Sequence, residues 1–128
     1  MLRVGCHCGG VRITLPGRPS VLTRCNCSMC RRIEPLFGYY AGRTITIDYA
    51  KAGLDEYAWG RRDLTWFRCT QCGCFTHHFP FGREHDPDAK AGINLRLADP
   101  ADLLGVEVEL KDGASDTWKI IRSYRFAV

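Results

Sequence analysis

All eight cysteines of this chain fall in three short clusters, and this limits how the chain can fold. The clusters are Cys6-x-Cys8, Cys25-x-Cys27-x-x-Cys30 and Cys69-x-x-Cys72-Gly73-Cys74. Thiols one or two residues apart can converge on one metal ion, whereas a disulfide between them would close a very small, strained ring. Zinc suits such pairs, because a tetrahedron of sulfur ligands is its commonest structural site. The clustering therefore predicts zinc-thiolate centres.

Glycines divide the clusters into two kinds. Gly9 follows Cys8 and Gly73 follows Cys72, so the chain can take a positive φ there and turn backbone N–H groups toward the sulfurs, as in a zinc knuckle. Two knuckles supply four sulfurs, which predicts one closed structural zinc site on Cys6, Cys8, Cys69 and Cys72. The middle cluster, Cys25, Cys27 and Cys30, supplies three sulfurs and predicts a second zinc with an open fourth position, the arrangement of a reactive site.

Length and composition indicate one domain, residues 1–128, because 128 residues with 45% apolar content can bury a core of their own. The first residues contain no apolar stretch that could direct secretion, and no run is long enough to span a membrane. We therefore expect a cytoplasmic protein with metal-bound thiols, the alternative being a secreted protein with four disulfides. The net charge of +4 comes from scattered arginines and gives no indication of nucleic-acid binding.

Apolar and polar residues alternate in several segments, as in half-buried strands. The expected strands are 11–15, 44–47, 64–68, 75–79 and 106–110, with the third cysteine cluster at the tip of a hairpin formed by 64–68 and 75–79. Helix is scarce: Asp99, Pro100 and Gly105 frame one or two turns, and a second short turn is expected over 27–32. The pattern predicts a mainly antiparallel β domain.

Three segments together resemble the glutathione-dependent formaldehyde-activating enzyme family, which includes centromere protein V. They are Gly5 to Arg12, Arg24 to Arg32 and Phe67 to Cys74, and the segment Ile93 to Leu97 followed by Asp99-Pro100 is similar to that family's downstream strand. The resemblance implies a β-tent fold, a structural zinc on Cys6, Cys8, Cys69 and Cys72, and a catalytic zinc on Cys25, Cys27 and Cys30. It also implies a carbon–sulfur lyase activity, in which glutathione and formaldehyde combine to S-hydroxymethylglutathione.

The chemistry of three thiolates on zinc is compatible with that activity. Three thiolates make the ion a poor Lewis acid for water, while a fourth, external thiol can still bind and lose its proton. We expect a small-molecule thiol to be held there beside an aldehyde. The proton for the new hydroxyl can come from water, His77, His78 or His85, and His77 and His78 must point to opposite faces if they are neighbours on a strand.

Two other classes of function are compatible with parts of the sequence. In the first, both zincs are structural and the sheet binds a protein or nucleic-acid partner; its exposed residues would be Tyr39, Tyr40, Trp59, Trp66 and Arg61-Arg62. In the second, Cys27-x-x-Cys30 is a redox pair, although no βαβ pattern surrounds it. Cys74 is either a small buried residue or a fourth ligand that would close the second site.

Overall fold

The computed structural model describes all residues 1–128 and is mainly β. The strands are β1 (Leu2–Gly5), β2 (Arg12–Leu15), β3 (Val21–Cys25), β4 (Phe37–Ala41), β5 (Thr46–Asp48), β6 (Leu54–Tyr57), β7 (Leu64–Cys69), β8 (Phe75–Pro80), β9 (Lys90–Asn94), β10 (Glu107–Lys111) and β11 (Ile120–Arg125). Helical turns are α1 (Cys30–Ile33) and the 3₁₀ turns η1 (Gly42–Thr44), η2 (Leu95–Leu97) and η3 (Pro100–Leu103). The prediction of a mainly β chain with a few short turns is confirmed.

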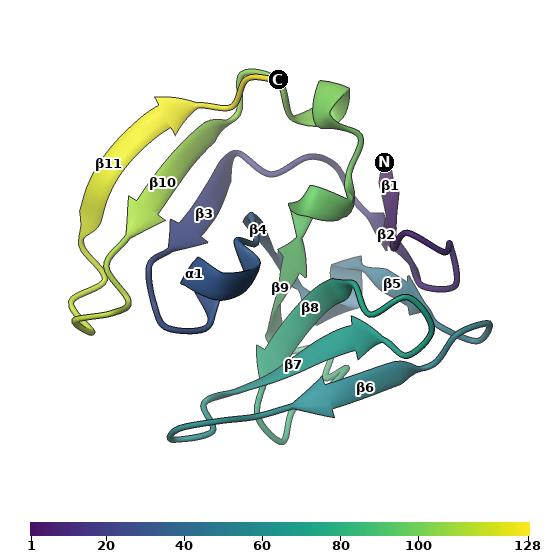
Figure 1. Cartoon of the computed structure of the whole chain (residues 1–128). Helices are drawn as coiled ribbons and strands as arrows, with labels where there is room; N and C mark the ends of the chain where they lie inside the picture. The colour runs from purple at the N-terminus through teal and green to yellow at the C-terminus, as the bar shows by residue number, and fades with distance from the viewer.

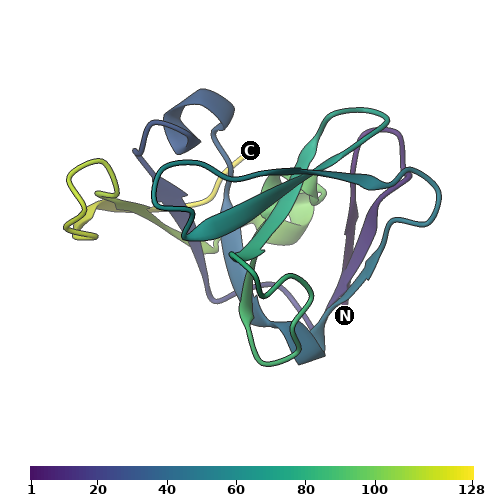
Figure 2. The ribbon, with the colours of Figure 1, turned by 90° about the horizontal axis from the view of Figure 1, so that it is seen from below.

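The strands form two sheets. The larger sheet has the order β11-β10-β3-β4-β9-β8-β7-β6, and the smaller one has the order β1-β2-β5. The large sheet bends sharply, so that β3, β10 and β11 lie on one side of the molecule and β6, β7 and β8 cross beneath them (Figure 1). Seen from below, the N-terminal strands stand on the side opposite the β10–β11 hairpin (Figure 2).

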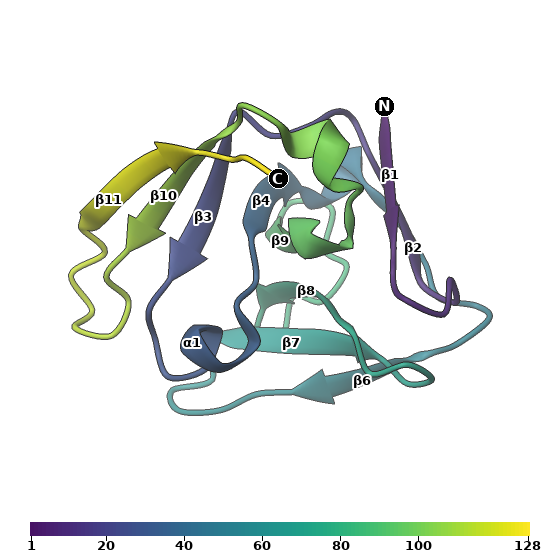
Figure 3. The same cartoon turned by 45° about the horizontal axis from the view of Figure 1, so that its top comes forward.

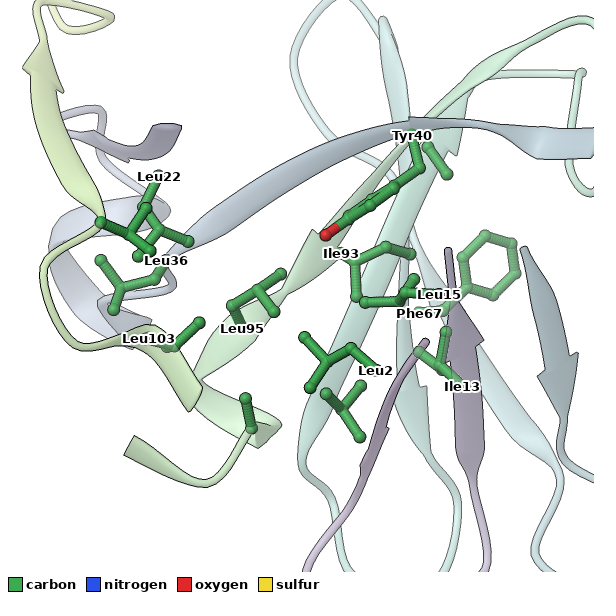
Figure 4. Packing of buried hydrophobic residues seen from close by; sticks show 14 of the residues in the cluster. Leu2, Ile13, Leu15, Leu22, Leu36, Tyr40, Phe67, Ile93, Leu95 and Leu103 are labelled. Atoms are coloured by element: carbon green, nitrogen blue, oxygen red, sulfur yellow. The ribbon is translucent and has the colours of Figure 1, made fainter. Parts of the chain in front are cut away.

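The core lies between the two sheets and follows from the alternation in the strands. In β2, Ile13 and Leu15 are fully buried while Arg12 is exposed, and in β10 Val108 is buried. Leu2, Ile93 and Leu95 pack with them in one apolar cluster, which also reaches the C-terminal turn at Leu103 (Figure 4). The core is therefore built from strands that are far apart in the sequence.

The short turns have the local signals expected of them. The Asp99 side chain accepts a hydrogen bond from the Ala101 N–H at 3.0 Å, Pro100 is the first residue of η3, and Gly105 takes φ of 79° just after it. The turn expected over 27–32 is present as α1, which begins only at Cys30.

Some expected strand limits were wrong. Thr44 belongs to the turn η1 and its strand begins at Thr46, while the strand expected over 93–97 ends at Asn94. There the Asn94 side chain accepts the Arg96 N–H at 3.1 Å and starts the turn η2 instead. The sheet also has one parallel pair, β3 with β10, among antiparallel ones. No helix is long and apolar enough to span a membrane.

Candidate metal centres and the adjoining cavity

The first cysteine group joins the β1–β2 hairpin to the β7–β8 hairpin. Cys6 and Cys8 lie in the turn after β1, Cys69 ends β7, and Cys72 lies in the turn before β8. Their four sulfur atoms lie within 4.8 Å of one another, with Cys8 Sγ 3.6 Å from both Cys6 Sγ and Cys69 Sγ. The structure thus brings together all four residues expected at the closed site.

Backbone N–H groups point at these sulfurs. Val11 N lies 3.2 Å from Cys6 Sγ, and Cys72 N lies 3.4 Å from Cys69 Sγ. Gly9 and Gly73 take φ of 77° and 79°, which confirms the expected knuckle turns. N–H donors stabilise thiolates, and those of Cys74 and Cys8 lower the pKa of Cys72 to about 5.

Cys74 belongs to this end of the molecule. It packs against the small apolar cluster of Cys6, Val11 and Cys69, and it is not among the sulfurs of the second group. The alternative in which Cys74 closes the second site is therefore wrong.

The second group is built by the end of β3 and the start of α1. The sulfurs of Cys25, Cys27 and Cys30 lie within 4.8 Å of one another. Cys27 N lies 3.4 Å from Cys25 Sγ, and Cys30 N lies 3.3 Å from Cys27 Sγ. A hydrogen bond from the Cys30 thiol, aided by the N–H groups of Cys27 and Gly113, outweighs burial and lowers the pKa of Cys25 to about 6. No fourth cysteine joins these three sulfurs.

Both groups can hold a metal ion, and their donor chemistry fits zinc. A tetrahedron with Zn–S bonds of 2.3 Å separates its sulfurs by about 3.8 Å. The sulfur–sulfur distances of 3.6 Å at Cys8 are close to that value. The N–H groups directed at the sulfurs are the outer contacts expected around metal-bound thiolates.

A cavity of about 870 Å³ opens beside the three-cysteine group. Its wall holds six rings, those of Phe37, Tyr39, Trp59, Trp66, His78 and Trp118. Phe37 and Trp66 are buried and pack on Cys30, with their ring centroids 5.9 Å apart. The three cysteines therefore line a largely aromatic hollow.

Two loops form the mouth of this cavity. The loop between β6 and β7 carries Trp59 and Arg61, and the hairpin turn between β10 and β11 carries Asp116 and Trp118. Both loops lie on the α1 side of the molecule in Figure 1 and in the tilted view of Figure 3. Arg61 Nη2 is 3.9 Å from Asp116 Oδ2, so an ion pair connects the loops across the mouth.

The hairpin turn is held against the cysteine segment by Asn26. Its Nδ2 donates to Asp112 Oδ1 at 3.2 Å, and its Oδ1 accepts from Ala114 N at 2.9 Å. Trp118 takes φ of 58°, which bulky residues rarely adopt, and its Nε1 donates to Asp116 at 2.9 Å. Asn26, between Cys25 and Cys27, thus holds the turn that carries Trp118.

The structure separates the three histidines that were considered as proton donors. His78 lines the cavity, 4.7 Å from Phe37 between ring centroids, and burial lowers its pKa to about 4. His77 points the other way, stacks on Phe67 at 4.6 Å, and has a pKa lowered to about 3 by burial. His85 packs with that second set of rings and is not part of the cavity wall.

The surface expected for a partner-binding module is only partly exposed. Tyr40 and Trp66 are buried, and the Tyr40 hydroxyl donates to Gly17 O at 2.8 Å. Tyr39 and Trp59 are partly exposed, but they face the cavity. The redox alternative would place Cys27-x-x-Cys30 in a βαβ unit with parallel strands. Here β3 and β4, on either side of Cys27 and Cys30, pair antiparallel.

Three residues that line the cavity were not expected from the sequence: Gly113, Asp116 and Trp118. The turn that holds them contains no cysteine, so no cysteine spacing refers to it. Asn26, the one polar amide inside the Cys25–Cys27 segment, was the available signal. The pairing of β10 with β3 brings these residues to the site.

Comparisons with known proteins include a related solved structure. No protein-family model matches the chain, and no curated protein matches it. A crystal structure of a Rhodobacter sphaeroides protein, a structural-genomics target, is similar with a TM-score of 0.62 and 30% sequence identity. The match covers 80% of this chain and 94% of the Rhodobacter sphaeroides chain. With this identity and coverage, the chain belongs to the same family as that Rhodobacter sphaeroides protein.

Proposed function

We propose that this protein is a zinc-dependent enzyme of the carbon–sulfur lyase type that forms or cleaves a thiol–aldehyde adduct, as in the formaldehyde-activating enzymes it resembles. The observation that carries the proposal is the group of three cysteines, without a fourth, in the lining of a cavity of about 870 Å³. Three protein ligands and an accessible fourth position distinguish a reactive zinc from a structural one.

The two groups have different roles in this proposal. Cys6, Cys8, Cys69 and Cys72 would hold a structural zinc, and Cys25, Cys27 and Cys30 would hold the catalytic one. Zinc held by this second group would supply a Lewis acid that lowers the pKa of a substrate thiol. The thiolate sulfur then forms a bond to the aldehyde carbon, and the carbonyl π electrons move to oxygen. That oxygen gains one proton, which balances the proton lost by the thiol, and no electrons are exchanged with a redox partner.

Tyr39 is placed to assist at the aldehyde oxygen. It lines the cavity, and burial together with the nearby Cys30 and Cys25 sulfurs raises the pKa of its hydroxyl. A hydroxyl that stays protonated can donate a hydrogen bond where negative charge develops. His78, neutral and largely enclosed, contributes one face of the wall.

The test combines metal analysis with an adduct-exchange assay. On reduced protein, we expect two zincs per chain and an X-ray absorption spectrum averaging fewer than four sulfurs per zinc. NMR exchange between formaldehyde and its thiol adducts should be accelerated by the protein. Cys27→Ser and Tyr39→Phe should lower that acceleration by about 100-fold and 10-fold or more respectively. Cys74→Ser, a cysteine outside both groups, is the matched control and should retain it.

A second candidate is a zinc-stabilised β module that binds a partner. The observation in its favour is β11, an edge strand on which all six residues are exposed, including Ile120 and Ile121. Unpaired edge strands can add a strand from another chain. Two zincs with four sulfurs each, and no accelerated exchange with any thiol, would favour this candidate over the enzyme.

A further inference from the structure

The wall of the cavity differs from a site built for a polar thiol. Six rings line it, and the two at the mouth, Trp59 and Trp118, are 38% and 54% exposed. Exposed tryptophans on both sides of one cavity provide apolar, flat contact area. The volume of about 870 Å³ is that of a pocket for a ligand of ordinary small-molecule size.

The four charged side chains around the cavity sum to zero. Its charged lining residues are Arg31, Arg61, Asp63 and Asp116. Arg61 forms ion pairs with Asp63 at 3.2 Å and with Asp116 at 3.9 Å, so its positive charge is already paired within the protein. Arg61 and its two aspartates together carry one negative charge, and Arg31, which forms no ion pair, carries one positive charge. Zinc on three thiolates would add one negative charge.

This charge distribution argues most strongly against anionic ligands. Glutathione carries two carboxylates and one ammonium group, and holding two carboxylates requires donors beyond the single unpaired Arg31. A cationic thiol would gain from the rings, but Asp63 and Asp116 at the wall are already paired with Arg61, and the unpaired Arg31 would repel it. A neutral group that stacks on the rings fills the cavity and adds no unpaired charge to it.

The two mouth loops are placed to enclose such a group. Trp59 comes from the loop before β7 and Trp118 from the turn before β11, and the Arg61–Asp116 ion pair connects the two loops. The Trp118 ring also lies close to Gly113, where a Cβ atom would be 3.0 Å from the indole and 2.4 Å from Cys25 Sγ. The indole is thus held next to a metal-ligand sulfur, within reach of a substrate bound at that sulfur group.

We propose that the thiol substrate, or its aldehyde adduct, carries a neutral aromatic group that lies against Trp59 and Trp118 while its sulfur reaches the group of Cys25, Cys27 and Cys30. This inference rests on the proposed function and names the class of thiol that the site selects.

Binding of four thiols to cobalt-substituted protein tests the inference without relying on activity. The probes are benzyl mercaptan, 2-mercaptoethanol, glutathione and thiocholine, and the readout is the sulfur-to-cobalt charge-transfer absorption, which changes when a thiol takes the open position. We expect the dissociation constant of benzyl mercaptan to be at least about tenfold lower than those of the other three, since ring contacts add to apolar burial.

Variants of the two tryptophans test whether these residues cause the preference for benzyl mercaptan. Trp59→Ala and Trp118→Ala should each weaken benzyl mercaptan binding about five- to tenfold and change 2-mercaptoethanol binding less than about twofold. Phe81→Ala removes an aromatic ring of similar exposure outside the cavity and should change neither. Far-ultraviolet circular dichroism of each variant verifies that it is folded.

The outcomes separate this inference from the function on which it rests. If no thiol alters the cobalt spectrum, the proposed function fails and the inference fails with it. If thiols bind but glutathione or thiocholine binds most tightly, or if both tryptophan variants bind benzyl mercaptan as well as the parent protein, the enzyme proposal stands and the aromatic substrate class is wrong.

Discussion

The neighbouring residues His77 and His78 on β8 lie in different surroundings, one in the core and the other at the cavity. His78 faces the cavity, whereas His77 is fully buried between Phe67 and Phe79 and shares a 2.8 Å hydrogen bond between its Nδ1 and the Thr76 hydroxyl. The Nε2 atom of His77 has no partner. Adding a proton there would place an uncompensated charge in the core.

This makes stability depend on pH with a definite sign. Burial lowers the pKa of His77 from 6.5 to about 3. Between these values the unfolded chain binds a proton that the folded chain does not, so the free energy of unfolding is highest above pH 6.5 and falls as the pH falls toward 3. For one proton the slope approaches about 1.4 kcal/mol per pH unit.

We therefore expect His77→Phe to lose less stability between pH 6.5 and pH 4 than the parent protein. Urea unfolding at several pH values measures this, with zinc content determined on the same samples. Protonation of the thiols affects both proteins equally, and so does His78. Equal slopes in the two proteins would show that His77 takes up its proton in the folded state.

At the scale of elements, the β10–β11 hairpin completes the site. Its turn meets the cysteine segment through Asn26, and its backbone at Gly113 lies directly against Cys25. The glycine is needed for space, because a Cβ atom there would lie 2.4 Å from Cys25 Sγ.

Gly113→Ala should therefore displace Cys25 and lower metal affinity at the three-cysteine group by about tenfold or more, while leaving the four-cysteine group unchanged. Titration of the metal with a competing chelator measures both affinities. Gly17→Ala is the matched control, since nothing lies within 4 Å of the Cβ position there and its φ is not in the left-handed region. Identical second-site affinities in the two variants would contradict the close contact.

The β10–β11 hairpin also shows which parts of the fold could not be predicted from the sequence. Segments whose sequence alternates apolar and polar residues, such as β2 and β10, were found, and so were both cysteine groups, because ligand spacing is a local property. β11 was missed because all its residues are exposed, so it lacks the apolar–polar alternation that indicates a half-buried strand. The parallel pairing of β3 with β10 depends on contacts across more than eighty residues, and no local pattern encodes it.

At the scale of the whole molecule, the four-cysteine group fastens the small sheet to the large one. Cys6 and Cys8 follow β1 in the small sheet, and Cys69 and Cys72 lie in the β7–β8 hairpin. The three-cysteine group instead lies within one segment beside the cavity. Loss of metal should therefore affect the two groups unequally.

We expect Cys69→Ser to lower the melting temperature of the zinc-loaded protein by at least about 10 °C, because it opens a site whose binding energy contributes to folding. Cys27→Ser should lower it by less than about 3 °C. Differential scanning calorimetry of reduced samples makes the comparison, with Cys74→Ser as control. If Cys27→Ser and Cys69→Ser destabilise the protein equally, the division into a structural and a catalytic zinc is wrong.

The distance along the chain between Cys8 and Cys69 has a consequence for biosynthesis. Their sulfurs are 3.6 Å apart although 61 positions separate them, and β3 likewise acquires β10 as a neighbour only near the end of the chain. A chain emerging from the ribosome therefore presents Cys6 and Cys8 before the other half of their site exists. The order of translation makes the N-terminal thiols the ones most open to oxidation or to capture by another metal, until the β7–β8 hairpin has been made.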